Sequence, residues 1–302
     1  MNFKAIVKLA QLYSTTASIF PVLVGLLYSW YHYQELNILN SFVLFIAVVL
    51  FHAAVNTRDE YLDYEIASNK KDPSAQEMTI GKENLSMPAV KKVYSITGII
   101  SALLGIYLVT QTSMALLYMG LICFLIGILY TAGPRPISST PFGEAFSGIA
   151  MGFGIYFITV FVNAFNVMAL DGPTLGKIFL ASLPTVIVVT NIMLANNICD
   201  LEEDIEDNRF TLPYYIGKPK SLVLFKWLYI LAYVSLIVSV FIGVYPKMVL
   251  LALLSIPLEK KNTDKFLAVQ VKSQTFMYAV QNSAIIPIFL IVTFGLGILL
   301  NF

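Results

Sequence analysis

The sequence is poor in charged residues, in histidine and in cysteine. Asp, Glu, Lys and Arg make up 12% of its 302 residues, whereas soluble domains carry about 25%. Two histidines, His32 and His52, lie too far apart in the sequence for a metal site, and we interpret both as structural. Two cysteines give no disulfide framework. The chain also lacks a glycine-rich phosphate loop and a Ser-His-Asp arrangement. These absences exclude an ordinary soluble domain and a disulfide-stabilised one.

Hydrophobic residues are abundant instead, at 58% of the chain. They gather in blocks of roughly 20 residues, the length a helix needs to cross a bilayer. The pattern predicts an all-α integral membrane protein, a single domain over 1–302 with about nine transmembrane helices. The first block has no small-residue cleavage site after it, so we expect it to be retained. The nine expected spans are 13–31, 40–60, 93–110, 113–131, 145–163, 178–197, 222–243, 247–258 and 276–300.

The eighth span is too short to cross unaided and needs a tilt or an extension past Pro257. With nine spans, 17 of the 19 Lys and Arg residues fall on one side, and only Lys177 and Lys247 fall on the other. An excess of Lys and Arg marks cytoplasmic loops. The distribution therefore predicts a cytoplasmic N-terminus and an outside C-terminus, in the cell membrane.

Acidic residues are concentrated on the same predicted side. Two loops, 58–92 and 198–226, hold 13 of the 18 Asp and Glu residues. In the second loop Asn196, Asp200 and Asp204 are spaced four apart, so they share one face if the sixth helix runs on through Asp204. Asn197 lies beside that stripe. We expect the neighbouring acids to be solvated; they are Glu202, Glu203, Glu206 and Asp207.

A matching stripe lies at the end of the second span. Asp59 and Asp63 are again four apart, and Asn56, one turn earlier, is a candidate substrate contact. Carboxylate and amide oxygens bind hard cations, and Mg²⁺ typically takes one or two carboxylates plus substrate phosphates. Ionisable groups at the inner end of a span are costly and favour a functional reading. Two such stripes facing each other predict a Mg²⁺ site that holds a diphosphate, opening to the cytoplasm.

Several basic and aromatic residues on this side are candidates for substrate contacts. Arg135 lies between two prolines and is our first candidate for gripping the diphosphate, although it also fits a topology-determining arginine. Arg209 either neutralises the acidic stripe or contacts phosphate. The same two roles are open to Arg58 and Lys70. Tyr130 either lines a pocket or belongs to an interfacial aromatic belt.

Three segments resemble a known family. NNICDLEEDIEDNRFTLPYYIGK at 196–218, YTAGPRPISSTPFGE at 130–144 and STTASIFPVLVGLLYSWY at 14–31 are similar to motifs of the UbiA superfamily of intramembrane aromatic prenyltransferases, the first most of all to its menaquinone branch. The first acidic motif departs from the pattern, because Asp59 stands where the family usually has Asn. The acid that the family carries later in this motif aligns near Asn69 rather than with an Asp, and Asp72 is the candidate to take its place.

The resemblance implies a helical bundle around a cavity open to lipid. Polyprenyl diphosphate would be held by Mg²⁺ on both motifs, with catalytic roles for Asp63, Asp200 and Arg135. The implied reaction is prenylation and decarboxylation of 1,4-dihydroxy-2-naphthoate to give demethylmenaquinone. The alternatives are another aromatic acceptor, such as 4-hydroxybenzoate, or a transporter of a small anion, a class whose charges favour the middle of the bilayer. No nucleic-acid or protein partner is predicted.

Overall fold

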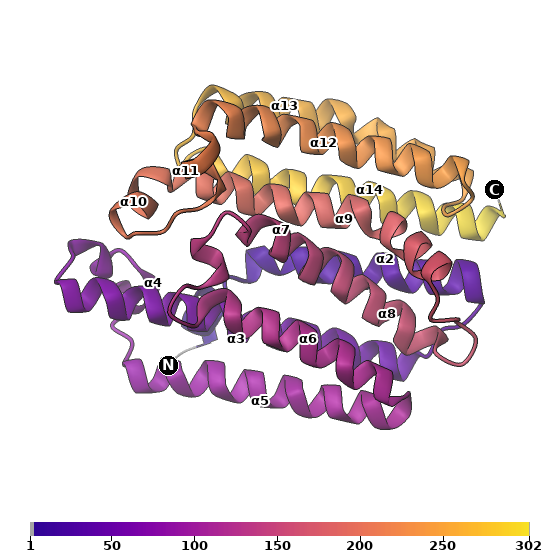
Figure 1. Ribbon diagram of the computed structural model, residues 1–302, viewed down its shortest axis with the longest axis horizontal. Coiled ribbons are helices and arrows are strands. Elements are labelled where there is room, and N and C mark those ends of the chain that lie inside the picture. The colour runs from indigo at the N-terminus through magenta and orange to yellow at the C-terminus, as the bar shows by residue number, and fades with distance from the viewer. Residues whose placement is uncertain (1–2, 302) are drawn as a thin grey trace.

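The computed structural model describes residues 3–301, which form helices joined by turns and contain no strand (Figure 1). The predicted all-α fold is therefore confirmed. Seven helices of the described range are long and apolar enough to cross a membrane. They are α3 (Ile38–Lys70), α5 (Met87–Gln111), α6 (Met114–Thr131), the continuous run from α7 to α8 (Gly143–Ala164), α9 (Gly172–Cys199), α12 (Lys218–Phe241) and α14 (Phe276–Leu300).

The other two predicted spans are helical but are not among these seven. The first corresponds to α2 (Thr16–Tyr33). The eighth begins as a 3-10 helix, Lys247–Ser255, and continues directly into α13 (Ile256–Ala268). Pro257 lies in the first turn of α13, where its missing N–H leaves no intrahelical bond unmade. The segment is therefore longer than predicted, and more than half of the expected loop 259–275 is helical.

Shorter helices connect the long ones, mostly at one end of the molecule. They are α1 (Phe3–Leu9), the 3-10 turn Leu12–Thr15, the 3-10 turn Pro73–Gln76, α4 (Thr79–Lys82), the 3-10 turn Ile137–Ser139, α10 (Leu201–Glu206) and α11 (Leu212–Ile216). Figure 1 shows α4, α10 and α11 together at one end and the C-terminus of the chain at the other.

Helix α3 extends well beyond its predicted end. Its 33 residues rise about 50 Å, against a hydrocarbon core of about 30 Å. Asn37 caps its start by accepting a hydrogen bond from the Asn40 N–H at 2.9 Å. Lys71 ends it in the left-handed conformation. The predicted loop 58–92 therefore starts with more than three helical turns, and Asp59 and Asp63 lie within a helix.

The second acidic motif is less regular than predicted. Helix α9 ends at Cys199, Asp200 caps it outside helical geometry, and α10 starts at Leu201. The single helix through Asp204, on which the shared face depended, is not formed, because a short Asp side chain favours a cap over a helix interior. Backbone bonds of helical spacing nevertheless cross the break, from Asp200 N to Asn196 O at 3.0 Å and from Asp204 N to Asp200 O at 2.7 Å. Asp200 and Asp204 therefore stay about one helical turn apart despite the break.

Helix α9 is the most buried of the seven long helices. It packs closely on the α7–α8 run, whose middle turns, Gly148–Gly154, form a π-helix. A Cβ atom on Gly152 would lie 2.4 Å from Val186 Cα, and one on Gly148 would lie 2.8 Å from the Val186 carbonyl oxygen. These two glycines therefore serve close helix packing, and they hold α9 in place below the acidic motif.

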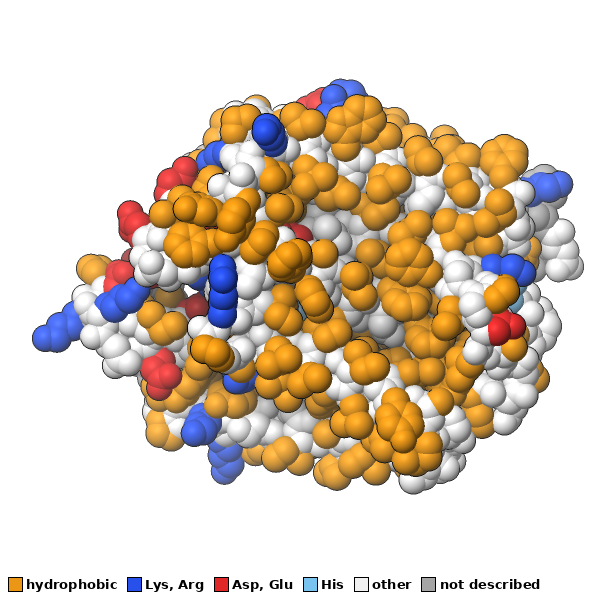
Figure 2. Space-filling model, in the orientation of Figure 1, with side chains coloured by type: hydrophobic (Ala, Val, Ile, Leu, Met, Phe, Trp, Pro, Cys, Tyr) orange, Lys and Arg blue, Asp and Glu red, His pale blue; other side chains and the backbone are white. Residues whose placement is uncertain are grey.

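Charged side chains gather at the end of the molecule where α4, α10 and α11 lie (Figure 2). Hydrophobic side chains cover the face between the two ends, and few charges are seen at the opposite end. Exposed apolar side chains on α5 and α6 contribute to this surface, among them Ile99, Leu103 and Leu121. Such a surface is stable only against an apolar medium. Together with the seven helices of span length, it makes this a multi-pass membrane protein.

Candidate active site

A cavity of about 740 Å³ lies among α2, α3, α5, α6, the α7–α8 run and α9. Most of its wall is apolar, and its far part is formed by Leu44, Val48, Leu108, Leu116 and Leu121. Its mouth is polar and lies at the charged end of α3 and α9. The polar side chains of the mouth are Asp59, Asp63, Asn196, Asp200, Arg209 and Lys272, and Asn56 lines the cavity one helical turn before Asp59. The cavity thus joins a charged mouth to a long apolar interior.

Two separate parts of the chain supply the carboxylates of the mouth. Asp59 and Asp63 lie one turn apart on α3, so the same face of the helix carries both to the cavity. Asn196 and Asp200 come from the end of α9, where the Asn196 amide donates to Asp200 Oδ2 at 3.1 Å. The structure therefore brings the two predicted motifs to one cavity.

Two cations neutralise these acids. Lys272 Nζ is hydrogen-bonded to Asp200 Oδ2. Arg209 Nη1 lies 3.7 Å from Asp63 Oδ1, and its Nε lies 3.2 Å from Asp204 Oδ1. Arg209 thereby connects the two acidic motifs. This contact corresponds to the first of the two roles considered for Arg209, the neutralisation of the acidic stripe. Both cations also border the cavity, where they can face a bound anion.

Asp204 supports Arg209 from behind the mouth. It is 6% exposed and does not border the cavity. Burial raises the pKa of Asp204 to about 6, although the Arg209 guanidinium opposes that rise. Burial lowers the pKa of Arg209, but the nearby carboxylates of Asp204 and Asp63 raise it by more. Asp204 also accepts a hydrogen bond from Thr211 Oγ1 at 3.3 Å. Arg209 therefore stays positively charged beside its carboxylate partners.

Two other predicted site residues do not border the cavity. The Asn197 amide donates to Glu144 Oε1 at 2.8 Å, and both residues are buried. Arg58 Nη1 donates to the Ile128 carbonyl oxygen at 3.3 Å and to Thr131 Oγ1 at 3.1 Å. Asn197 therefore fastens α9 to α7, and Arg58 fastens α3 to the end of α6.

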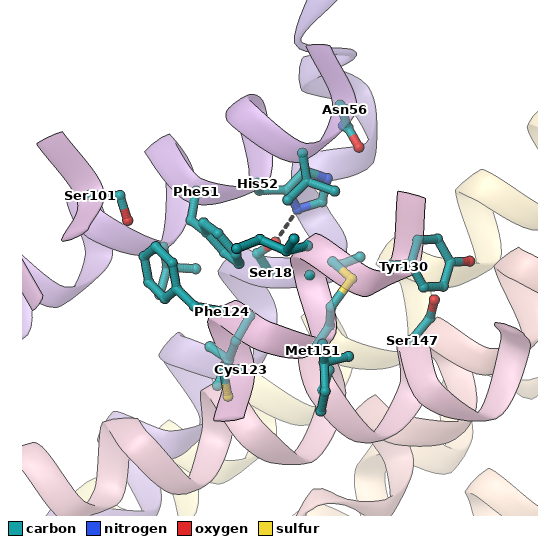
Figure 3. Close-up of a pocket in the computed structure, with 18 of the residues that line it drawn as sticks. Ser18, Phe51, His52, Asn56, Ser101, Cys123, Phe124, Tyr130, Ser147 and Met151 are labelled. Carbon is teal, nitrogen blue, oxygen red and sulfur yellow. Dashed lines mark hydrogen bonds between the residues drawn. The ribbon is translucent and has the colours of Figure 1, made fainter. Parts of the chain in front are cut away.

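The remaining candidates divide between surface and cavity. Lys70 pairs with Asp207 at 2.6 Å, with both side chains about half exposed. Arg135 is exposed in the turn after α6 and does not border the cavity. Tyr130 does line the cavity, and its side chain lies beside Ser147 (Figure 3). The acids expected to be solvated are exposed; they are Glu202, Glu203, Glu206 and Asp207.

The side chains of the mouth suit a metal ion whose coordination shell is completed by a bound ligand. Within residues 3–301, no three His, Cys, Asp or Glu side chains converge closely enough to bind one ion by themselves. Asp59, Asp63 and Asp200 nevertheless border one mouth with the Asn196 amide. Mg²⁺ needs only one or two carboxylates when phosphate oxygens complete its shell. The donor set therefore fits a Mg²⁺ shared with a diphosphate better than a closed protein site.

Sequence reasoning missed two basic side chains that border the cavity, Lys272 and His52. Lys272 lies 72 positions from Asp200, and no local pattern connects them. His52 was interpreted as structural, yet it lines the cavity. A signal for it was present, because 52, 56, 59 and 63 recur at helical spacing and so fall on one face of α3.

The fold and the site together define a helical membrane protein with an acidic, cation-neutralised mouth above an apolar cavity. The sequence matches the profile of the UbiA prenyltransferase family over residues 18–259. It is 30% identical over 250 residues to 1,4-dihydroxy-2-naphthoate octaprenyltransferase of Bacillus subtilis, covering 83% of this chain and 78% of that one. The chain belongs to the UbiA prenyltransferase family, as the resemblance of its motifs implied.

Solved structures show the same fold. A UbiA homolog from Aeropyrum pernix K1 superposes with a TM-score of 0.67 at 16% identity, covering 95% of this chain and 98% of that one. A UbiA homolog from Archaeoglobus fulgidus, bound to DMAPP and Mg²⁺, gives a TM-score of 0.66 at 10% identity, covering 96% and 99%. At these identities the similarity establishes the fold alone.

Proposed function

We propose that this chain transfers a polyprenyl group from polyprenyl diphosphate to 1,4-dihydroxy-2-naphthoate, with loss of the carboxyl group, on the route to demethylmenaquinone. The observation that carries the proposal is the cavity itself, in which a charged mouth leads into an apolar interior of about 740 Å³. A diphosphate with a long hydrocarbon tail has the same division into charged and apolar parts. The choice of acceptor is supported by the Bacillus subtilis relative.

The mouth supplies two kinds of contact for the diphosphate. Asp63 and Asp200, with Asp59 and Asn196 beside them, would hold Mg²⁺, which neutralises the growing charge of the leaving diphosphate. The positive side chains of Arg209 and Lys272 would bind phosphate oxygens directly, because each already faces the mouth. This assigns the direct phosphate contact to these two residues.

Three sequence-predicted phosphate contacts lie outside the cavity. Arg135 is exposed, Arg58 is bonded to the end of α6, and Lys70 pairs with Asp207. They are therefore not part of the proposed set, and their roles remain sequence predictions.

The interior protects the reaction from water. Phe51, Phe124, Tyr130 and Met151 line the cavity below the mouth (Figure 3). The bond between the first prenyl carbon and the diphosphate oxygen breaks, and both electrons leave with the diphosphate. The ring carbon that carries the carboxylate then bonds to that prenyl carbon. Cleavage of the ring-to-carboxylate bond returns its electron pair to the ring and releases CO₂, so no net proton transfer is needed. A dry, aromatic wall prevents water from capturing the allylic cation first.

We further propose that this protein lies in the cell membrane, with nine spans and a cytoplasmic N-terminus. The mouth of the cavity would then open to the cytoplasm. Support comes from the one-sided distribution of Lys and Arg in the sequence. The charged end of the molecule in Figure 2 is also the end where the mouth lies. The transporter alternative loses its support, because the family is one of prenyltransferases.

The test is an acceptor panel with the purified protein, farnesyl diphosphate and Mg²⁺. We expect prenylation of 1,4-dihydroxy-2-naphthoate with one CO₂ released per product, and loss of turnover when EDTA removes the metal. Asp200→Asn should lower turnover by at least about 100-fold, in the range reported for loss of one transition-state electrostatic contact. Asp207→Asn, which removes an exposed acid of the same segment, should retain activity. Prenylation of 4-hydroxybenzoate alone would overturn the proposed acceptor.

A further inference from the structure

A chain of hydrogen-bonded polar side chains lines the cavity just below its acidic mouth, and the chemistry proposed above does not use it. It connects His52 and Asn56 of α3 with Ser14 of the 3-10 turn and Ser18 of α2, and all four border the cavity. Figure 3 shows His52, Asn56 and Ser18 at the cavity wall. His52 is 9% exposed and Ser18 is 1% exposed. Burying such groups in an apolar segment is costly unless they are hydrogen-bonded. Their position beside a substrate cavity suggests a role beyond packing.

The protons in this chain of side chains can be assigned. The Ser14 hydroxyl has one proton and donates it to the Gln11 carbonyl oxygen at 2.9 Å. Its oxygen therefore accepts from His52 Nε2 at 3.0 Å, which makes Nε2 the protonated nitrogen. Nδ1 of the neutral imidazole then accepts from the Ser18 hydroxyl. Both nitrogens of His52 are thus satisfied, and the ring is fixed in one orientation.

This network also fixes the amide of Asn56. Asn56 Nδ2 donates to the Ala10 carbonyl oxygen at 3.0 Å and to Ser14 Oγ at 2.9 Å. A main-chain carbonyl only accepts, so the nitrogen of the amide must face Ala10. The oxygen Oδ1 then lies on the other side of the amide, and these two bonds do not use it. Asn56 therefore presents a fixed hydrogen-bond acceptor at the cavity wall.

We propose that Asn56 Oδ1 accepts the hydrogen bond of a phenolic hydroxyl on the aromatic acceptor, and that His52, Ser14 and Ser18 hold the amide in that orientation. This inference rests on the proposed function. A carboxylate does not fit the contact, because it has no proton to donate and its charge would repel Oδ1. Asn56 lies seven residues before Asp63, about 10 Å along the helix, which leaves the ring between Oδ1 and a diphosphate at the mouth.

The hydroxyl concerned is the one remote from the carboxylate. In 1,4-dihydroxy-2-naphthoate the 1-hydroxyl can bond internally to the neighbouring carboxylate, whereas the 4-hydroxyl is free to donate to the protein. The 4-hydroxyl is meta to the ring carbon that carries the carboxylate, so a hydrogen bond from it to Oδ1 positions the ring and leaves the activation of that carbon to the neighbouring 1-hydroxyl. Asn56 would therefore both select a hydroxylated acceptor and orient it for attack on the prenyl carbon.

The experiment compares two ligands in matched variants of the purified full-length chain. Dissociation constants of 1,4-dihydroxy-2-naphthoate and 1-hydroxy-2-naphthoate are measured by calorimetry without oxygen, with Mg²⁺ and farnesyl thiodiphosphate as a slowly reacting donor. Asn56→Ala should weaken binding of the dihydroxy compound about tenfold, the effect of one lost hydrogen bond, and leave the monohydroxy compound within about twofold. His52→Ala should show the same selectivity to a smaller degree.

The control is Ser101→Ala, which removes another cavity-lining hydroxyl, one that donates to the Ala47 carbonyl oxygen at 2.7 Å. It should change neither constant. Equal weakening of both ligands by Asn56→Ala, or no weakening, would overturn the contact. If Asn56→Ala does not fold, the wild type decides the question: the 4-methyl ether cannot donate and must bind about tenfold more weakly than the dihydroxy compound.

Failure of this inference can be distinguished from failure of the proposed function. A wild type that prenylates the naphthoate, with an Asn56 variant that shows no ligand selectivity, overturns only the contact. A wild type that uses 4-hydroxybenzoate instead overturns the proposed acceptor. The same comparison is then made with 4-hydroxybenzoate and benzoate, and the contact predicts a selective loss for the hydroxylated ligand there as well.

Discussion

At the scale of single residues, the charge of the mouth is set by partners from distant parts of the chain. Asp200 is paired with Lys272, and Asp63 with Arg209. Without a cation nearby, each partly buried carboxylate would be expensive to keep ionised. The two cations therefore hold the acids ready for a ligand, and a bound metal and diphosphate would replace these pairs with pairs of their own.

This arrangement predicts the effect of removing Lys272. In Lys272→Ala, kcat/KM for the diphosphate donor should fall by about 10- to 100-fold, because a charge-assisted bond to a phosphate oxygen contributes about 1.5–3 kcal/mol. Steady-state kinetics at saturating Mg²⁺ measures the effect. The control is Lys260→Ala, since Lys260 also pairs with an aspartate, Asp264, at 2.5 Å, but on the exposed surface outside the cavity. A lower Mg²⁺ requirement with an unchanged donor KM would show instead that Lys272 only competes with the metal for Asp200.

At the scale of elements, the position of the second acidic motif depends on how closely α9 packs. The π-helix Gly148–Gly154 brings two glycines against Val186, and Asn197 is bonded to Glu144 of α7 one turn before Asp200. The α7–α8 run thus sets the position of the end of α9 relative to α3. A displacement of α9 would separate Asp200 from the acids of α3.

Gly152→Ala should therefore destabilise the protein, because its Cβ would lie 2.4 Å from Val186 Cα, and main-chain atoms cannot move aside cheaply. We expect a loss of about 1–3 kcal/mol, the range for overpacking, seen as a lower thermal midpoint in detergent. Gly176→Ala is the matched control, since it lies in α9 with nothing within 4 Å of its Cβ. Helix propensity favours that change by about 0.8–1.0 kcal/mol. Equal midpoints for the two variants would contradict the packing argument.

At the scale of the whole molecule, the charged residues define one end. That end contains the cavity mouth, while the remaining surface is largely hydrophobic (Figure 2). A charged substrate group thus meets its site at the membrane surface, and its apolar tail can stay at the depth of the hydrocarbon core. The two halves of the substrate are matched to the two environments of the protein.

This orientation can be measured by cysteine labelling. In a background without Cys123 and Cys199, single cysteines replace the exposed Lys91, at the charged end, and Lys177, at the opposite end. A membrane-impermeant maleimide should label Lys177→Cys in intact cells, because that loop is expected outside. Lys91→Cys should be labelled only after permeabilisation. The reverse pattern would overturn the predicted topology.

The helices and their approximate ends follow from the sequence because apolar blocks of span length have few alternative structures in a bilayer. The ends were predicted least well where polar residues continue a helix, as at Asp59 and Asp63 of α3, or interrupt one, as at Asp200. Local charge content does not separate these two outcomes. Packing against neighbouring helices decides between them.

By itself, the sequence determined the membrane setting, the helical fold and the two acidic motifs, because each is written in local spacing along the chain. Only the tertiary structure decided which of those acids share a cavity and which cations neutralise them. It directs Asn197 to Glu144 and brings Lys272 to Asp200. It also places His52 and Asn56 in one hydrogen-bonded wall. These contacts join residues up to 72 positions apart, and such pairings arise only when the helices pack.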